Sequence, residues 1–186
     1  MKQRIWMTVG AVALAGLVWT GCAVTRAGYE SAPYRIVEKD GRVELREYPA
    51  LRVAETQQGG DDFMRLFRYI SKGNATEQKI AMTTPVFMVG EGSTNAQMAF
   101  VLPETLTNPP APANDQVVVR EMPPATYAVL RFKGGQQGPD GKAAEELRAW
   151  MEQRKLTAKG DPQFAYFDPP WIPGFLCRNE VMIPIQ

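Results

Sequence analysis

The first part of the chain alternates apolar and polar residues with a period of two. The segment YRIVEKDGRVELREYPALRVAET, residues 34–56, keeps this alternation and has turn signals at Asp40-Gly41 and at Pro49. Such alternation is typical of antiparallel strands that have one face in water. The segment therefore predicts several antiparallel strands in succession.

The pattern then changes to a helical period. Four apolar residues recur at positions i, i+3, i+4 and i+7, namely Phe63, Leu66, Phe67 and Ile70. This spacing indicates a helix with an apolar stripe that faces the core. Asp61 or Asp62 can cap the start of this helix, and Gly73 ends it. Two further strands are predicted near residues 85–89 and at 97–103.

The second half of the chain repeats the order of the first. A segment at 104–115, rich in Pro and Asn, can form neither a helix nor a central strand, and it divides the chain. After it, VELREYP at 43–49 returns as VVVREMP at 117–123. A strand, a Gly-rich turn and an amphipathic helix follow in each half, and strands at QFAYFD and EVMIPI end the second.

These elements predict an α+β fold. Each half reads as a strand-strand-helix-strand-strand unit, over about 34–103 and about 116–186, and is too small for a core of its own. We expect the two repeats to join their sheets into one distorted antiparallel β-barrel flanked by two helices. A chance match over seven residues is the alternative explanation of the repeat.

The N-terminus has the layout of a secretory signal. Lys2 and Arg4 precede an apolar run, 5–19, which is shorter than the roughly 20 residues that a spanning helix needs. The run ends in VWTGC, which looks like a bacterial lipobox, so Cys22 would be acylated and become the new N-terminus. A plain signal peptide or an uncleaved anchor is the alternative.

A lipoprotein reading also sets the domain limits. It gives a lipoprotein signal peptide at 1–21, a tether at 22–33 and one domain at 34–186. Ala23, in place of Asp after the cysteine, resembles the signal for sorting to the outer membrane. We therefore expect a domain that is anchored to the outer membrane by lipid and faces the periplasm.

Composition excludes several classes of function. The chain has no histidine, which excludes His-based catalysis, His-ligated zinc and a proximal-His heme ligand. Its formal net charge is +1, and loss of Lys2 and Arg4 with the signal lowers this by two, so nothing indicates binding to nucleic acid. We expect Cys177 to be buried and inert. No residue pattern indicates catalysis, so we expect a binding protein and not an enzyme.

Two segments carry a resemblance to a known family. FRYISKGNATEQKIAMTTPVFM at 67–88 and PPWIPGFLCRNEVMIPI at 169–185, together with VELREYP, resemble the SOUL heme-binding protein family. The resemblance implies a two-repeat α+β domain, similar to the effector-binding domains of some drug-sensing regulators. It also implies binding of heme or a related tetrapyrrole in an apolar groove beside the first helix. Some members ligate the iron through a histidine, so this chain would have to bind without one.

Six residues are candidates for the walls of that groove: Met64, Phe67, Arg68, Lys72, Lys79 and Met82. The first four lie on or beside a second stripe of the helix, next to its core face, and the last two lie in the segment after it. The apolar groups would cover the ring and the cations would pair with the propionates. An axial ligand would have to be Met64, Met82 or a tyrosine. The alternative is that the apolar residues belong to the core and the cations are solvated.

Three other functions compete with heme binding. The first is an effector-binding-type carrier or sensor of amphipathic cationic small molecules, which a buried acidic residue in the groove would favour. The second is an enzyme that modifies tetrapyrroles. The third is a structural envelope protein without a small ligand, for which the groove would be filled. Exposure of Met64 and Phe67 would favour a binding groove, whereas their burial would make the helix scaffold only.

Overall fold

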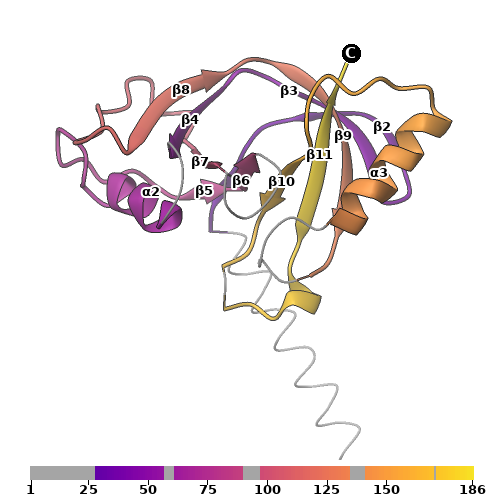
Figure 1. The fold of residues 1–186 in the computed structure, drawn as a ribbon. Coiled ribbons are helices and arrows are strands. Elements are labelled where there is room, and N and C mark those ends of the chain that lie inside the picture. The colour runs from indigo at the N-terminus through magenta and orange to yellow at the C-terminus, as the bar shows by residue number, and fades with distance from the viewer. Residues whose placement is uncertain (1–27, 57–60, 90–96, 135–140, 170) are drawn as a thin grey trace, which may run out of the picture.

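One large antiparallel sheet forms most of the domain (Figure 1). The computed structural model describes residues 28–56, 61–89, 97–134, 141–169 and 171–186. The nine strands of the sheet are β2 (Arg35–Asp40), β3 (Val43–Tyr48), β4 (Leu51–Thr56), β6 (Val86–Val89), β7 (Gln97–Val101), β8 (Val117–Met122), β9 (Ala125–Phe132), β10 (Gln163–Tyr166) and β11 (Asn179–Ile185). The remaining elements are α2 (Asp62–Ile70), α3 (Gly141–Gln153), the 3-10 helix η1 (Gly174–Leu176) and a small parallel pair, β1 (Glu30–Ser31) and β5 (Thr83–Thr84).

The strand order mixes the two halves of the chain. It runs β2-β3-β9-β11-β10-β6-β7-β4-β8, and β10 of the second half pairs with β6 of the first. The counterparts in the two halves are β3 and β8, β4 and β9, β6 and β10, and β7 and β11. If each strand from β3 to β8 is replaced by its counterpart, the result is the same order read from the opposite end. The predicted repeat would produce this order, but the repeat itself stays a prediction. The α+β class, the curled antiparallel sheet and the two flanking helices are confirmed.

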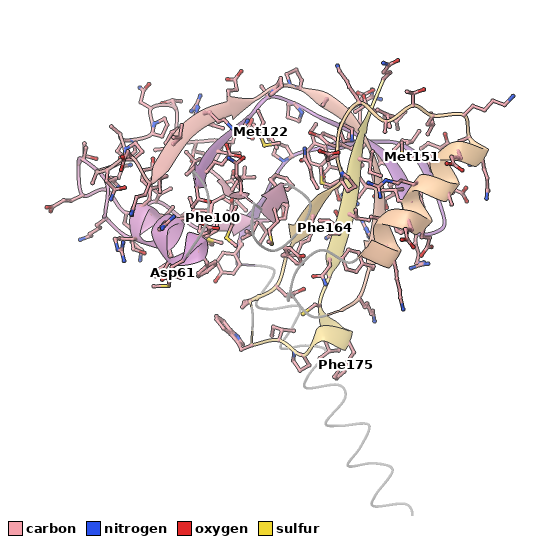
Figure 2. All side chains as sticks on the ribbon, viewed as in Figure 1. Asp61, Phe100, Met122, Met151, Phe164 and Phe175 are labelled. Atoms are coloured by element: carbon pink, nitrogen blue, oxygen red, sulfur yellow. The ribbon has the colours of Figure 1, made fainter. Side chains whose placement is uncertain are left out.

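The two faces of the sheet carry different cores. One face holds a single hydrophobic cluster, which contains both Tyr48 of β3 and Met122 of β8. Because these strands lie toward opposite ends of the sheet, this face is the inner face of a half-barrel. The outer face holds two separate clusters, one beneath each helix. Phe100 lies close to α2 and Phe164 lies on the side of α3 (Figure 2). Within the described ranges, neither helix is long and apolar enough to cross a bilayer.

The buried stripe of α2 differs from the prediction. Leu66, Tyr69 and Ile70 are buried, whereas Phe63 and Phe67 are exposed. Tyr69 can take a core position because its hydroxyl donates a hydrogen bond to the carbonyl of Pro110 at 2.8 Å. The prediction that both phenylalanines face the core is therefore wrong, because the stripe is rotated around the helix toward Tyr69.

The ends of α2 are fixed by the backbone. Asp61 occupies the N-cap position, as predicted, but its side chain makes no capping hydrogen bond. The N–H of Gly73 donates to the carbonyl of Arg68 at 2.8 Å where the chain leaves the helix. A Cβ at Gly73 would lie 2.7 Å from that carbonyl oxygen, so the close approach requires glycine.

The end of the expected tether is part of the fold. β1 pairs in parallel with β5, and the N–H of Ala32 donates to the carbonyl of Thr84 at 2.8 Å. Ala32 is buried in the inner core. The fold therefore includes residues 30–32, which the sequence assigns to the tether.

A buried ion-pair network joins β3 to β11 across β9. Arg46 is fully buried, and its guanidinium donates to Glu180 at 2.7 and 3.0 Å and to Glu44 at 2.8 Å. Arg131 lies 3.3 Å from Glu44 and 3.2 Å from Glu180. Burial by itself would raise the pKa of Glu180, but the hydrogen bonds and charge of Arg46 outweigh burial and hold this pKa below its ordinary value. Glu180 therefore stays ionised and fixes Arg46 on the inner face.

Removal of the charge of Glu180 should destabilise the domain strongly. Glu180→Gln leaves the Arg46 guanidinium buried beside a neutral amide, and we expect the free energy of unfolding to fall by about 3 kcal/mol. Glu47→Gln is the matched control on β3, the strand of Arg46, because its partner Arg35 is exposed, and it should change stability by less than about 1 kcal/mol. Urea denaturation of the two variants measures both values. Equal, small losses would contradict a structural role for the network.

Candidate functional site

A groove opens on the outer face of the sheet between the two helices. α2 packs mainly on β4, β7 and β8, and α3 packs on β9 and β11. The main contacts of both helices are with other strands than β6 and β10 in the middle of the sheet, and the groove, of about 430 Å³, is lined by side chains of these two strands. Its thirteen lining residues in the described part of the chain are Tyr29, Phe63, Phe67, Met82, Thr84, Val86, Met88, Met98, Tyr166, Phe167, Asp168, Pro169 and Trp171.

The walls of the groove are mainly aromatic rings and thioethers. Phe63 and Phe67 stack side by side on α2, with ring centroids 6.0 Å apart and an angle of 11° between their planes. Met82, Met88 and Met98 add three flexible thioethers. Flat rings and adaptable thioethers suit a planar apolar ligand. The rings also remain accessible to a ligand, since both phenylalanines are exposed.

Asn74 orders the polar loop that follows α2. Its buried Nδ2 donates to the carbonyls of Tyr69 at 2.9 Å and Gln78 at 2.7 Å. Its Oδ1 accepts the backbone N–H of Thr76 at 3.3 Å and of Gln78 at 3.0 Å. Because one amide binds the last turn of α2 as well as Thr76 and Gln78 of the loop, the polar segment is folded against the helix end and returns the chain to β5. Met82, directly before β5, thereby reaches the groove.

Two of the six predicted groove residues, Phe67 and Met82, line the groove. The other four do not line it: Met64, Arg68, Lys72 and Lys79. Successive helix residues turn by about 100°, so Met64 points away from the sheet and Arg68 lies on the flank of α2 opposite to Phe67. There Arg68 lines a separate, small cavity with Tyr69. The side chains of Met64 and Phe67 are both 43% exposed, which is the condition that favours a binding groove over a pure scaffold.

The second wall of the groove was not predicted from the sequence. It comes from the end of β10 and the segment after it, where Tyr166, Phe167 and Trp171 line the groove. The available signal was the Pro-rich run PPWIPGF, in which Trp171 and Phe175 follow neither a strand period nor a helix period. Aromatic residues without such a period cannot be assigned to the core-facing side of a strand or a helix.

Asp168 supplies the charge of the groove. It is the one charged residue among the thirteen, and no Lys or Arg of the described chain lines the groove. The Asp168 carboxylate is buried, and its Oδ2 accepts the backbone N–H of Arg178 at 2.6 Å. The guanidinium of Arg178 lies 4.0 Å from the ring centre of Phe167 and 2.8 Å from Glu180. The groove therefore presents an apolar surface with a carboxylate at its second wall.

Metal-binding side chains do not gather in the described part of this region. Among the described residues, no cluster of three or more Asp, Glu, Cys or His side chains is placed to hold a metal ion. Cys177 is buried, as predicted, and its Sγ donates to the carbonyl of Ile172 at 3.4 Å. The apolar lining of the groove is suited to the reversible burial of an apolar molecule.

Solved structures share this fold at low sequence identity. The C-terminal domain of EcmrR is 16% identical, with 82% of this chain and 98% of that domain covered and a TM-score of 0.54. EcmrR in a complex with DNA is 14% identical, with 100% of this chain and 70% of that chain covered and a TM-score of 0.58. A hydrolase from Listeria innocua is 9% identical, with 81% and 94% covered and a TM-score of 0.56. At these identities the likeness shows the fold alone.

A family model identifies the chain more closely. No match is found among curated proteins. The model described as SOUL heme-binding protein matches residues 29–184, a span that contains both helices and the whole groove. The resemblance seen in the sequence is confirmed by this match. The chain belongs to the SOUL heme-binding protein family.

Proposed function

We propose that the protein binds heme or a related tetrapyrrole in the groove over β6 and β10, without histidine ligation. The observation that carries this proposal is the open apolar groove, with Phe63 and Phe67 on one wall and Trp171 on the other. Its volume of about 430 Å³ falls in the usual range of small-molecule sites. The family to which the chain belongs is described by heme binding.

The groove fits the ring of a tetrapyrrole better than its carboxylates. The phenylalanine pair and Met88 would lie against the ring face, and the thioethers and the phenols of Tyr29 and Tyr166 are the lining groups able to ligate iron. Heme, when bound, would supply the ligand and redox chemistry of its iron. Since no described Lys or Arg lines the groove, the propionates would lie at its open side in water. Pairing of the propionates with Arg68, Lys72 or Lys79 stays a prediction.

The same groove supports binding and not turnover. Its one carboxylate, Asp168, has no histidine or thiol beside it in the lining, because the sequence lacks histidine and Cys177 lies outside the groove. General acid–base catalysis uses a side chain that is positioned to exchange a proton with the substrate, most often a histidine. We therefore propose a binding protein and not an enzyme.

We also propose that the protein is a lipoprotein of the bacterial envelope, acylated at Cys22 and held on the outer membrane facing the periplasm. The support is the VWTGC motif after the apolar run and Ala23 after the cysteine. The signal peptide and Cys22 lie outside the described residues.

Heme titration tests the groove with a matched pair of variants. Addition of heme to the purified protein should shift the Soret band, with a dissociation constant in the micromolar range and a spectrum unlike that of bis-His heme. Phe67→Ser should weaken binding by about tenfold, because it removes apolar contact worth about 1.5 kcal/mol. Met64→Ser, on the same helix and equally exposed but outside the groove, should bind as the unaltered protein does. An unchanged Soret band, or equal effects of both substitutions on heme affinity, would contradict the proposal.

A second candidate function is supported by one observation. A buried carboxylate, Asp168, lines an otherwise apolar groove, and this is the arrangement that a carrier or sensor of amphipathic cations requires. A cation that leaves water needs a counter-charge of this kind. The groove is open, which disfavours a purely structural role.

Asp168→Asn separates the two functions. The substitution keeps the shape and an oxygen acceptor for the N–H of Arg178 but removes the charge. Affinity for a fluorescent lipophilic cation, measured by anisotropy, should fall about tenfold if cations are the ligands. Heme affinity should change little. A cation that binds both proteins equally well would exclude the second candidate.

A further inference from the structure

We propose that the loop between β10 and β11 inserts its tip into the surface of a lipid bilayer and turns the groove toward the membrane. Trp171 and Phe175 lie in this loop and are 76% and 69% exposed, the highest values for large apolar side chains among the described residues. The sequence from 169 to 177 contains no charged residue. Aromatic side chains on an uncharged protrusion are characteristic of contact with the membrane interface.

The loop is built to present these side chains. Backbone hydrogen bonds join Ile172 to Pro169 at 3.1 Å and Leu176 to Pro173 at 2.8 Å, and η1 forms the turn at the tip. The N–H of Gly134 also donates to the carbonyl of Gly174 at 3.2 Å, which ties the tip to the chain after β9. Local structure therefore holds the aromatic groups outward.

The loop projects from one end of the molecule. Figure 2 shows Phe175 at the lower end, far from Met122 and Met151. The C-terminus lies at the opposite end of β11 (Figure 1). Lys133 is exposed next to Gly134, which is hydrogen-bonded to Gly174 of the loop, and its ammonium group suits the phosphates of lipid headgroups.

The segment between Cys22 and Tyr29 is short, so a lipid on Cys22 would hold the end of the molecule with the β10–β11 loop near a membrane. Tyr29 lines the groove together with Trp171, and β1 begins one residue later. Six residues lie between Cys22 and Tyr29, and the seven Cα-to-Cα steps that join the two span at most about 25 Å when fully extended. A lipid on Cys22 would therefore enter the bilayer within that distance of the groove. This step rests on the proposed acylation of Cys22, whereas the exposure of Trp171 and Phe175 does not.

The proposed orientation would affect how a ligand reaches the groove. Trp171 belongs both to the loop and to the groove wall, so the opening of the groove would meet the bilayer surface. If the proposed function holds, an apolar ligand dissolved in the membrane would enter the groove without crossing water.

Photo-crosslinking from lipid tests the insertion residue by residue. The full-length protein is reconstituted into vesicles of phosphatidylethanolamine and phosphatidylglycerol that carry a diazirine on an acyl chain, and adducts are located by mass spectrometry. We expect adducts at 171–176. Ile36 and Val37 on the edge strand β2 are the internal control, because they are 46% and 49% exposed but lie away from the loop, and they should remain unlabelled (Figure 1).

Phe175→Ser supplies the matched variant, since Phe175 does not line the groove. It should lower labelling of the loop by about threefold, whereas Val37→Ser should leave it unchanged. Absence of loop adducts, equal labelling of β2, or cross-links from the loop to a second copy or another protein would overturn the proposal. If Phe175→Ser fails to fold, as judged by thermal denaturation, the pattern in the unaltered protein decides. No heme is present, so the result is independent of heme binding.

Discussion

Nine strands at about 4.8 Å spacing make a sheet roughly 40 Å wide, and two helices of about 10 Å diameter cannot cover such a width. In this protein α2 packs mainly on β4, β7 and β8 and α3 packs on β9 and β11, so part of the surface over β6 and β10 stays open between the helices. The apolar side chains on these strands, such as Met88 and Tyr166, then form the floor of the groove. Each 100 Å² of this floor that a ligand covers contributes about 2.5 kcal/mol. The binding site is therefore a consequence of how the sheet and the helices match in size.

The two walls of the groove come from different halves of the chain and are held in different ways. Asn74 holds the wall after α2 with local hydrogen bonds. The opposite wall is connected to the buried ion pairs of the inner face, because Arg178 contacts both Asp168 and Glu180, and Glu180 binds Arg46. One wall of the groove is thus connected to a charge network on the other side of the sheet.

Much of the fold could be predicted from the sequence because it is encoded in local periods. Alternation identified the strands at 34–56, and the spacing of apolar residues identified both helices. The period alone could not distinguish the core stripe of α2 from its flank, since the choice depends on the partner that Tyr69 finds in Pro110. The groove wall after β10 and the pair of Arg46 with Glu180, 134 positions apart, depend on long-range strand pairing that no local pattern reveals. In the sequence Arg46 looks like any polar residue of an alternating strand.

The proposed function depends on one interaction, in which a planar pigment lies over β6 and β10 without a histidine to hold its metal. Anomalous diffraction at the iron edge, from crystals of the heme complex, tests this claim most directly. The account predicts a single iron peak inside the groove, between Met82 and Tyr166. A peak outside the groove, for example beside Met64 and Arg68 on the other flank of α2, would contradict it.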